Sequence, residues 1–133
     1  MYIYKIILVL ALLSLLVVSL LPQRAIAEPV EIQVRSSNIK VYAFEKVLDR
    51  WGEKEWDYFN ELIERESHWD SEAQNPYSTA YGLAQFLNST WKTVGCKKTA
   101  DKYEQIDCAV KYIEARYKTP KKAIEFHNRK NWY

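Results

Sequence analysis

The feature of this chain that most constrains its fold is an apolar stripe with helical spacing that ends on a carboxylate. Trp56, Phe59 and Ile63 precede Glu66 at intervals of three, four and three residues, which is the spacing of one face of an α-helix. Glu66 therefore falls on the face that we expect to pack against the core. Burial among apolar groups raises the pKa of a carboxyl group, so Glu66 could hold a proton near neutral pH and deliver it as a general acid.

Other segments carry helical signals of their own. Gly52 ends one such segment, the helix of Glu66 starts near Glu53, and Thr119-Pro120 reads as an N-cap followed by a proline in the first turn. Helices are predicted over residues 42–51, from about 53 through Glu66, over 102–117 and over 120–128. The helix at 42–51 has one apolar side, formed by Phe44, Val47, Leu48 and Trp51. The helix at 102–117 has one apolar stripe, formed by Ile106, Ala109, Val110, Ile113 and Tyr117.

The N-terminus has the layout of a secretory signal peptide over residues 1–27. Lys5 precedes a mainly apolar run from Ile6 to Leu21, and Ala25-Ile26-Ala27 forms a small-x-small cleavage site. An uncleaved membrane anchor is the alternative, although the run is short for a spanning helix and is closed by Pro22 and Arg24. Either way, the rest of the chain is expected outside the cytoplasm, in the periplasm or extracellular space. Residues 28–40 show no helical period and are predicted to form a flexible lead-in to a single domain at 41–133.

The charge of the exported part is balanced. The chain has 19 basic and 17 acidic residues, and removal of Lys5 and Arg24 with the signal leaves equal numbers. Nucleic acid is therefore an unfavoured partner, because phosphate binding needs a basic excess. Basic residues gather near the C-terminus. We interpret them as a solvated helix face, and attraction to an anionic cell wall is the alternative. Nothing in the sequence suggests more than a monomer.

Cys96 and Cys108 are the only cysteines, and an even pair in an exported chain favours a disulfide. A Cys-x-x-Cys redox motif is missing. His68 and His127 have no spacing to cysteines or carboxylates that resembles a zinc ligand set, so no metal and no cofactor is predicted. Ser67 lacks the Gly-x-Ser-x-Gly context of a serine nucleophile, and we expect it to form hydrogen bonds near the acid or the substrate.

A polar loop follows the Glu66 helix. It runs from about Ser71 to Tyr81, contains the turn signal Asn75-Pro76, and re-enters the fold at Gly82. A long polar loop beside a buried acid suits a substrate groove. Among the aromatic residues, Trp56 and Trp91 are assigned to the core, and the loop residues Tyr77 and Tyr81 are candidates for stacking on sugar rings.

These residues together resemble a known family. Glu66-Ser67-x-Trp69-Asp70, Ser78-x-Ala80-x-Gly82-Leu83-x-Gln85-Phe86 and Thr90-Trp91 are similar to the core of the soluble lytic transglycosylase-like domains, which are related to goose-type lysozyme. The similarity continues through Gln105-Ile106, Tyr112-Ile113-x-x-Arg116-Tyr117-x-Thr119-Pro120 and the terminal Trp132-Tyr133, and covers roughly residues 51–133. A glutamate near a helix end is a weak signal alone, but these motifs in this order are fairly specific.

The resemblance implies an all-α, lysozyme-like fold and an enzyme that acts on peptidoglycan glycan strands. It implies cleavage of the β-1,4 bond between N-acetylmuramic acid and N-acetylglucosamine, with Glu66 as the single acid and base and with 1,6-anhydromuramyl ends as products. Gln85, which would otherwise read as a helix-surface glutamine, becomes a substrate-binding candidate. The full set of substrate-binding candidates is Ser67, Ser78, Tyr81, Gln85, Tyr112 and His127.

The chain departs from the best-known branch of the family near its C-terminus. That branch has an Ala-Tyr-Asn-Ala-Gly run whose tyrosine contacts the catalytic glutamate, whereas this chain has Phe126 followed by His127. Phe126 has no hydroxyl, so Tyr112, Tyr133 and His127 are all candidates for orienting Glu66.

Two other functions compete with transglycosylation. One is a true muramidase that adds water to the cleaved bond. Ordinary glycosidases use two carboxylates, and Asp70, one helical turn beyond Glu66, is the candidate for the second, although a capping or surface role is commoner for such a residue. The other is a wall-binding module that has lost catalysis.

Overall fold

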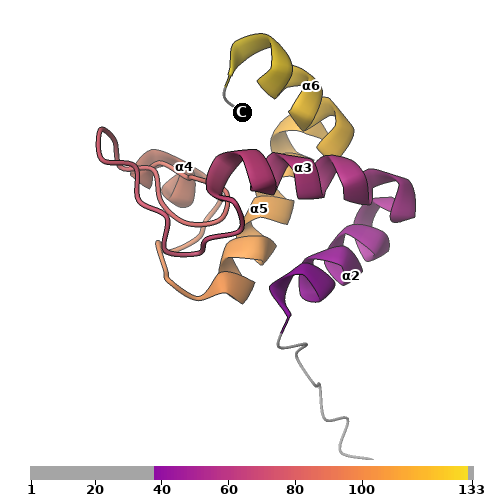
Figure 1. The fold of residues 1–133 in the computed structure, drawn as a ribbon, viewed down its shortest axis with the longest axis horizontal. Helices are drawn as coiled ribbons and strands as arrows, with labels where there is room; N and C mark the ends of the chain where they lie inside the picture. The colour runs from indigo at the N-terminus through magenta and orange to yellow at the C-terminus, as the bar shows by residue number, and fades with distance from the viewer. Residues whose placement is uncertain (1–37, 132–133) are drawn as a thin grey trace, which may run out of the picture. The chain divides into compact units, whose positions relative to one another are not determined.

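The structure is a computed structural model that describes residues 38–131. The expected signal peptide, the lead-in up to residue 37 and the last two residues lie outside the described part. Figure 1 shows the elements in chain order: α2 (Ile39–Trp51), the 3-10 turn η1 (Glu53–Glu55), α3 (Trp56–Ser67), α4 (Asn88–Thr93), α5 (Lys102–Tyr117) and α6 (Pro120–Lys130).

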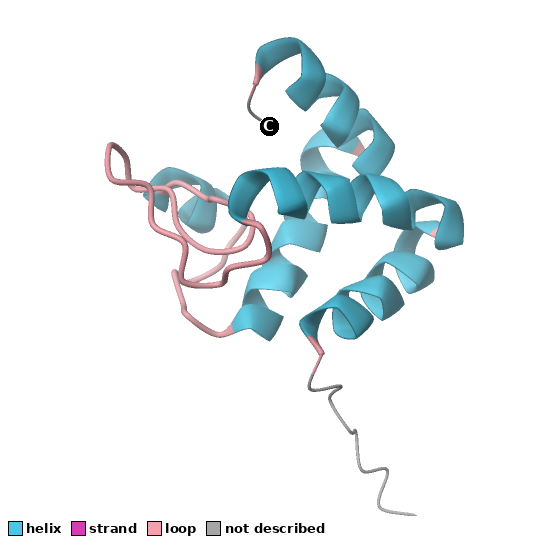
Figure 2. Cartoon of the chain, viewed as in Figure 1, coloured by secondary structure: helices cyan, strands magenta, loops and turns pink. Residues whose placement is uncertain are grey.

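The described residues form an all-α domain. Within them, β structure is limited to isolated bridges that Tyr81 makes with Gln74 and Phe86. Helices α2 and α6 each pack against both α3 and α5. The loop that follows α3 lies together with α4 at the left of the view in Figure 2. None of the helices between residues 38 and 131 is both long enough and apolar enough to cross a membrane.

The core is built from the predicted stripes of α3 and α5. Phe59 and Ile63 of α3 and Ile106 and Ile113 of α5 are completely buried. The bounds of α5 match the prediction, because Asp101 caps its first turn by accepting hydrogen bonds from the backbone N–H groups of residues 103 and 104. Every residue of the stripe predicted for α5 is buried.

Helix α2 differs from its prediction in two ways. It begins at Ile39 and not at Tyr42, because the side chain of Asn38 accepts a hydrogen bond from the backbone N–H of residue 40 at 2.9 Å and caps the helix. Its buried face is also rotated, since Tyr42 is buried and Leu48 remains 45% exposed. The hydroxyl of Tyr42 donates to the carboxylate of Asp107 on α5 at 3.0 Å, which fixes this face toward α5. The predicted apolar side, which includes Leu48, therefore does not coincide with the buried face.

Helix α6 is capped as predicted and runs two residues further. The Thr119 hydroxyl accepts a hydrogen bond from the backbone N–H of Lys122 at 3.3 Å, and Pro120 opens the first turn. The helix ends at Lys130 because Asn131 adopts the left-handed conformation, with φ of 59°. Ala123 and Ile124 are buried on the face toward the core.

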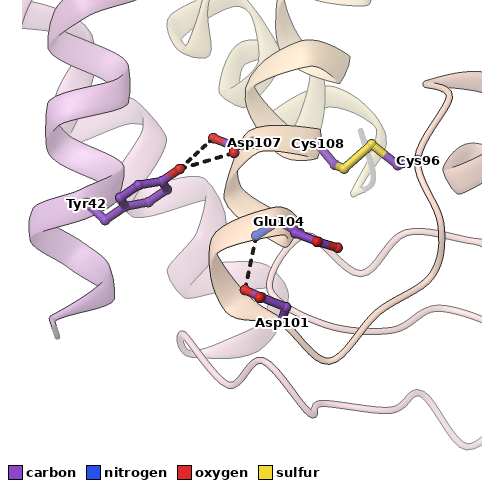
Figure 3. The surroundings of a disulfide bond; sticks show 6 residues. All are labelled: Tyr42, Cys96, Asp101, Glu104, Asp107 and Cys108. Carbon is purple, nitrogen blue, oxygen red and sulfur yellow. Dashed lines mark hydrogen bonds between the residues drawn. A yellow bond between two sulfur atoms is a disulfide. The ribbon is translucent and has the colours of Figure 1, made fainter. Parts of the chain in front are cut away.

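The predicted disulfide between Cys96 and Cys108 is present (Figure 3). It joins the segment after α4 to the middle of α5 across a sequence separation of 12 residues. Closure of a loop of this size stabilises a fold by roughly 3 kcal/mol in the chain-entropy model. The bridge therefore attaches the segment between α4 and α5 to α5, the helix that carries much of the core.

The buried side chain of Gln105 holds three separate loop segments. Only 1% exposed, it accepts a hydrogen bond from the backbone N–H of Leu83 at 2.7 Å and donates to the carbonyls of Ser71 and Thr99, each at 2.8 Å. Gly82 lies directly over this amide with φ of 78°, and a Cβ there would lie 2.6 Å from Oε1 of Gln105. A glycine at position 82 is therefore required both by its backbone conformation and by the close approach.

Candidate active site

Glu66 lies in the last turn of α3, on the buried stripe as the sequence predicted. Its side chain is 16% exposed. Burial raises the pKa of the Glu66 carboxyl from its usual 4.5 to about 7. The position near the negative end of the helix dipole acts in the same direction. Glu66 can therefore hold a proton at neutral pH and still release it.

A cavity of about 530 Å³ opens beside Glu66. This volume is in the range of ordinary ligand pockets. Glu66 is the only carboxylate among the described residues that line the cavity. The lining residues come from α3, the loop before α4, α4, α5 and the end of α6: Glu66, Asn75, Ala80, Ala84, Gln85, Phe86, Leu87, Ser89, Thr90, Tyr112, Arg116 and Asn131.

His127 of α6 faces Glu66 directly. Its Nε2 lies 3.0 Å from Oε1 of Glu66, and the His127 side chain is 15% exposed. Burial lowers the pKa of His127; the charge of Arg65 acts in the same direction and that of Glu61 opposes it. With the Glu66 pKa raised and the His127 pKa lowered, the pair favours a protonated carboxyl beside a neutral imidazole over two opposite charges.

Helices α3 and α6 are clamped together next to this pair. Arg65 donates to the side-chain oxygen of Asn128 at 2.6 Å and forms an ion pair with Glu61 one turn earlier on α3. These contacts are at the surface, where an ion pair contributes little stability by itself. Because Asn128 directly follows His127, the hydrogen bond from Arg65 to Asn128 holds the part of α6 that carries His127 against α3.

Ser67 is buried beside the acid and does not line the cavity. Its hydroxyl donates to the carbonyl of Leu83 at 2.8 Å, and the residue is 7% exposed. We expected a hydrogen bond near the acid or the substrate; the hydrogen bond instead joins the end of α3 to the loop that carries Gln85. A substrate contact for Ser67 therefore stays a prediction.

Gln85 lines the cavity but is also part of the loop's own structure. It lies in the loop with φ of 47°, not on a helix. Its side-chain nitrogen donates to the carbonyls of Ala73 and Gly82, both at 3.0 Å. Both amide hydrogens are thereby used, so its Oε1 is the side-chain atom that could accept a hydrogen bond from a ligand.

Ser78 and Tyr81 also lie outside the cavity lining, as do the candidates Ser67 and His127. Ser78 is exposed, and its hydroxyl accepts a hydrogen bond from the backbone N–H of Ala80 at 3.2 Å, which stabilises the loop turn. Tyr81 has its ring beneath the ammonium of Lys98, which lies 4.9 Å from the ring centroid. Neither side chain lines this cavity, and a substrate contact by either stays a prediction. Tyr77, 96% exposed, is not among the lining residues either.

Tyr112, a substrate-binding candidate, lines the cavity and contacts Arg116, which belongs to the family pattern but was given no role from the sequence. Its hydroxyl accepts a hydrogen bond from Nη1 of Arg116 at 2.8 Å, and its ring packs edge-on against Phe86 at 4.9 Å between centroids. Arg116 follows one helical turn later on α5, so an i, i+4 comparison would have found it. Within residues 38–131, no three side chains among His, Cys, Asp and Glu come together in a way that could hold a metal ion.

The fold and the site define a class of protein: a helical domain that holds one buried, proton-bearing carboxyl at the wall of an open cavity. The family model described as the transglycosylase SLT domain matches residues 44–130, and the chain belongs to this family. No curated protein and no solved structure matches the chain. Family membership confirms the lysozyme-like, all-α domain and assigns the chain to enzymes of the lytic transglycosylase type, which act on peptidoglycan in the periplasm or extracellular space.

Proposed function

We propose that this protein cleaves the β-1,4 bond between N-acetylmuramic acid and N-acetylglucosamine in peptidoglycan and leaves 1,6-anhydromuramyl ends. The observation that carries this proposal is the single carboxyl of Glu66, buried at the wall of a 530 Å³ cavity with a pKa of about 7. Both protonation states of such a group are populated near neutral pH, which one residue needs if it is to act first as an acid and then as a base.

The first step is proton transfer from the Glu66 carboxyl to the glycosidic oxygen, which leaves C1 of the muramyl sugar. The acetamido oxygen of the same sugar attacks C1 as that bond breaks and forms a cyclic oxazolinium intermediate. Glu66, now ionised, takes the proton of the muramyl 6-hydroxyl. The freed oxygen bonds to C1 and displaces the acetamido oxygen, so Glu66 ends protonated and water is not consumed.

The position of Asp70 supports a mechanism with one carboxylate. Asp70 is exposed, and its Oδ1 accepts a hydrogen bond from the backbone N–H of Glu72 at 2.8 Å, which makes it a capping group beyond α3. A retaining or inverting glycosidase would place a second carboxylate across the scissile bond from the acid. Among the described lining residues, none besides Glu66 could fill that role.

The proposed substrate contacts are those that line the cavity. Gln85 offers an amide oxygen to a sugar hydroxyl or an acetamido N–H, and Tyr112 presents an aromatic face beside Arg116. Export through residues 1–27, with cleavage after Ala27, is part of the same proposal, since peptidoglycan lies outside the cytoplasm. The mass of the chain recovered from the secreting cell would test the cleavage site.

Turnover of purified sacculi tests the role of Glu66. Glu66→Gln keeps the shape of the side chain but cannot give or take a proton, so we expect solubilisation of sacculi to fall at least about 100-fold. Asp70→Asn is the matched control and should retain wild-type activity. Full activity of Glu66→Gln would overturn the assignment, and loss of activity in both Glu66→Gln and Asp70→Asn would favour a muramidase with two carboxylates.

A further inference from the structure

Three residues are candidates for the group that orients Glu66: Tyr112, Tyr133 and His127. The hydroxyl of Tyr112 accepts a hydrogen bond from Arg116, and Tyr133 lies outside the described residues. Phe126 has no hydroxyl, and its ring packs against Tyr117 with centroids 5.4 Å apart. Among the described contacts, the polar partner of the Glu66 carboxyl is Nε2 of His127, at 3.0 Å.

We infer that His127 is a positioning residue that holds the Glu66 carboxyl in one orientation through both its protonated and its ionised form. This inference rests on the proposed function of Glu66 as an acid that becomes a base. The two side chains project from different helices, α6 and α3, so the contact fixes the carboxyl relative to the cavity and not only relative to its own helix.

A neutral imidazole suits this task when its proton is on Nε2, which lies 3.0 Å from Oε1 of Glu66. That N–H donates to Oε1 both in the carboxylic acid and in the carboxylate, because a protonated carboxyl still has acceptor capacity. The other carboxyl oxygen then carries the proton that passes to the glycosidic oxygen, and His127 neither gains nor loses a proton in the reaction. A reacting group misplaced by about 1 Å can lose on the order of 100-fold in rate, so continuous orientation matters to the reaction.

The surroundings decide which partner carries the proton before the reaction. Both side chains are about equally shielded from solvent, at 15% and 16% exposed, and burial penalises an ion pair between them. The charged groups near the pair are Glu61 and Arg65 on α3 and Arg116 on α5, which lines the same cavity. Arg65 disfavours a second positive charge on the imidazole. The proton therefore rests on the carboxyl, where the glycosidic oxygen can receive it.

Three variants of the full chain test the inference. His127→Leu removes both hydrogen-bonding functions, and His127→Gln keeps a donor and an acceptor but cannot titrate. His68→Asn is the matched control, because His68 is the only other histidine, is exposed, and has a left-handed conformation with φ of 52° that asparagine tolerates. Activity on sacculi is measured as kcat and KM separately over a range of pH.

We expect His127→Leu to lower kcat on the order of 10- to 100-fold with little change in KM, because the substrate still binds while the carboxyl loses its orientation. The alkaline limb of its pH profile should move upward, since the ionised carboxyl loses a donor. His127→Gln should recover most of kcat, and His68→Asn should match the wild type. A His127→Leu variant with wild-type kcat and an unmoved alkaline limb would overturn the inference.

A second measurement separates failure of this inference from failure of the proposed function. The ring signals of the two histidines are titrated by NMR in the wild type and in Glu66→Gln, which requires no catalysis. If the pair exists, the midpoint of His127 moves in Glu66→Gln. An unchanged His127 midpoint contradicts the pairing, even if His127→Leu proves too unstable to assay. If the wild type is inactive but the His127 midpoint still moves in Glu66→Gln, the proposed function is contradicted and the pairing is not.

Discussion

The contact between Gly82 and Gln105 predicts that Gly82→Ala is far more damaging than an ordinary glycine substitution. A left-handed backbone costs an alanine roughly 1–2 kcal/mol. In addition, the new Cβ would lie 2.6 to 2.8 Å from three atoms of the Gln105 amide. That amide makes three hydrogen bonds to loop backbone, and each lost bond costs about 1 kcal/mol.

The expected loss is about 3–5 kcal/mol, a large part of the 5–15 kcal/mol that usually stabilises a domain. Gly95→Ala is the matched control, because Gly95 also has a left-handed conformation, with φ of 70°, but has nothing within 4 Å of an added Cβ. Gly95→Ala should lose only the roughly 1–2 kcal/mol that a left-handed backbone costs an alanine. Urea unfolding followed by tryptophan fluorescence gives the free energy of unfolding for both variants. Equal losses, within about 0.5 kcal/mol, would refute the close-approach reasoning.

Three further perturbations test other parts of the structure. Replacement of Cys96 and Cys108 by serine should lower the free energy of unfolding by roughly 3 kcal/mol, and reduction of the wild type should reproduce that loss. Ser67→Ala removes the 2.8 Å hydrogen bond to the Leu83 carbonyl and should cost about 1 kcal/mol of stability. Because this bond joins the end of α3, next to Glu66, to the loop that carries Gln85, the variant should reduce kcat more than it changes KM. An effect confined to KM would contradict a role of this bond in positioning Glu66. Because burial raises the pKa of Glu66 from 4.5 to about 7, the folded chain retains a proton that the unfolded chain releases, and stability should fall as the pH rises through that window. The decline should amount to at most about 3 kcal/mol and should be absent from Glu66→Gln. The lowered pKa of His127 gives a slope of the opposite sign, and the NMR titration of each protein supplies its midpoint. Parallel stability curves would contradict the raised pKa of Glu66.

Much of the fold could be predicted because its signals are local. The apolar stripe of α5, the Thr119-Pro120 start of α6 and the paired cysteines each depend on residues close in sequence or on simple counting. The face of α2 was harder, because a helical stripe that includes Val47 can be centred on Leu48 or on Ala43. The tertiary contact of Tyr42 with Asp107 decides between them.

In the site, too, some residues could be placed from a local sequence pattern, whereas others depend on tertiary contacts. The burial of Glu66 follows from a periodic pattern, so the sequence predicted it. Side chains of a loop have no period, so the directions of Ser78 and Tyr81 could not be read from spacing. The approach of His127 to Glu66 depends on how α6 packs against α3, across 61 positions of sequence. A buried glutamine such as Gln105 carries no pattern of its own and becomes visible only through the loop carbonyls that it holds.

The most direct test of the proposed chemistry is mass spectrometry of the muropeptides released from purified sacculi. Proton transfer by Glu66 without a water nucleophile predicts that the wild type releases chains ending in 1,6-anhydromuramyl sugar, lighter by one water than the hydrolysed form, and that Glu66→Gln releases almost none. Reducing muramyl ends as the main product would contradict transglycosylation, and anhydromuramyl ends at the wild-type rate from Glu66→Gln would contradict the role of this carboxyl.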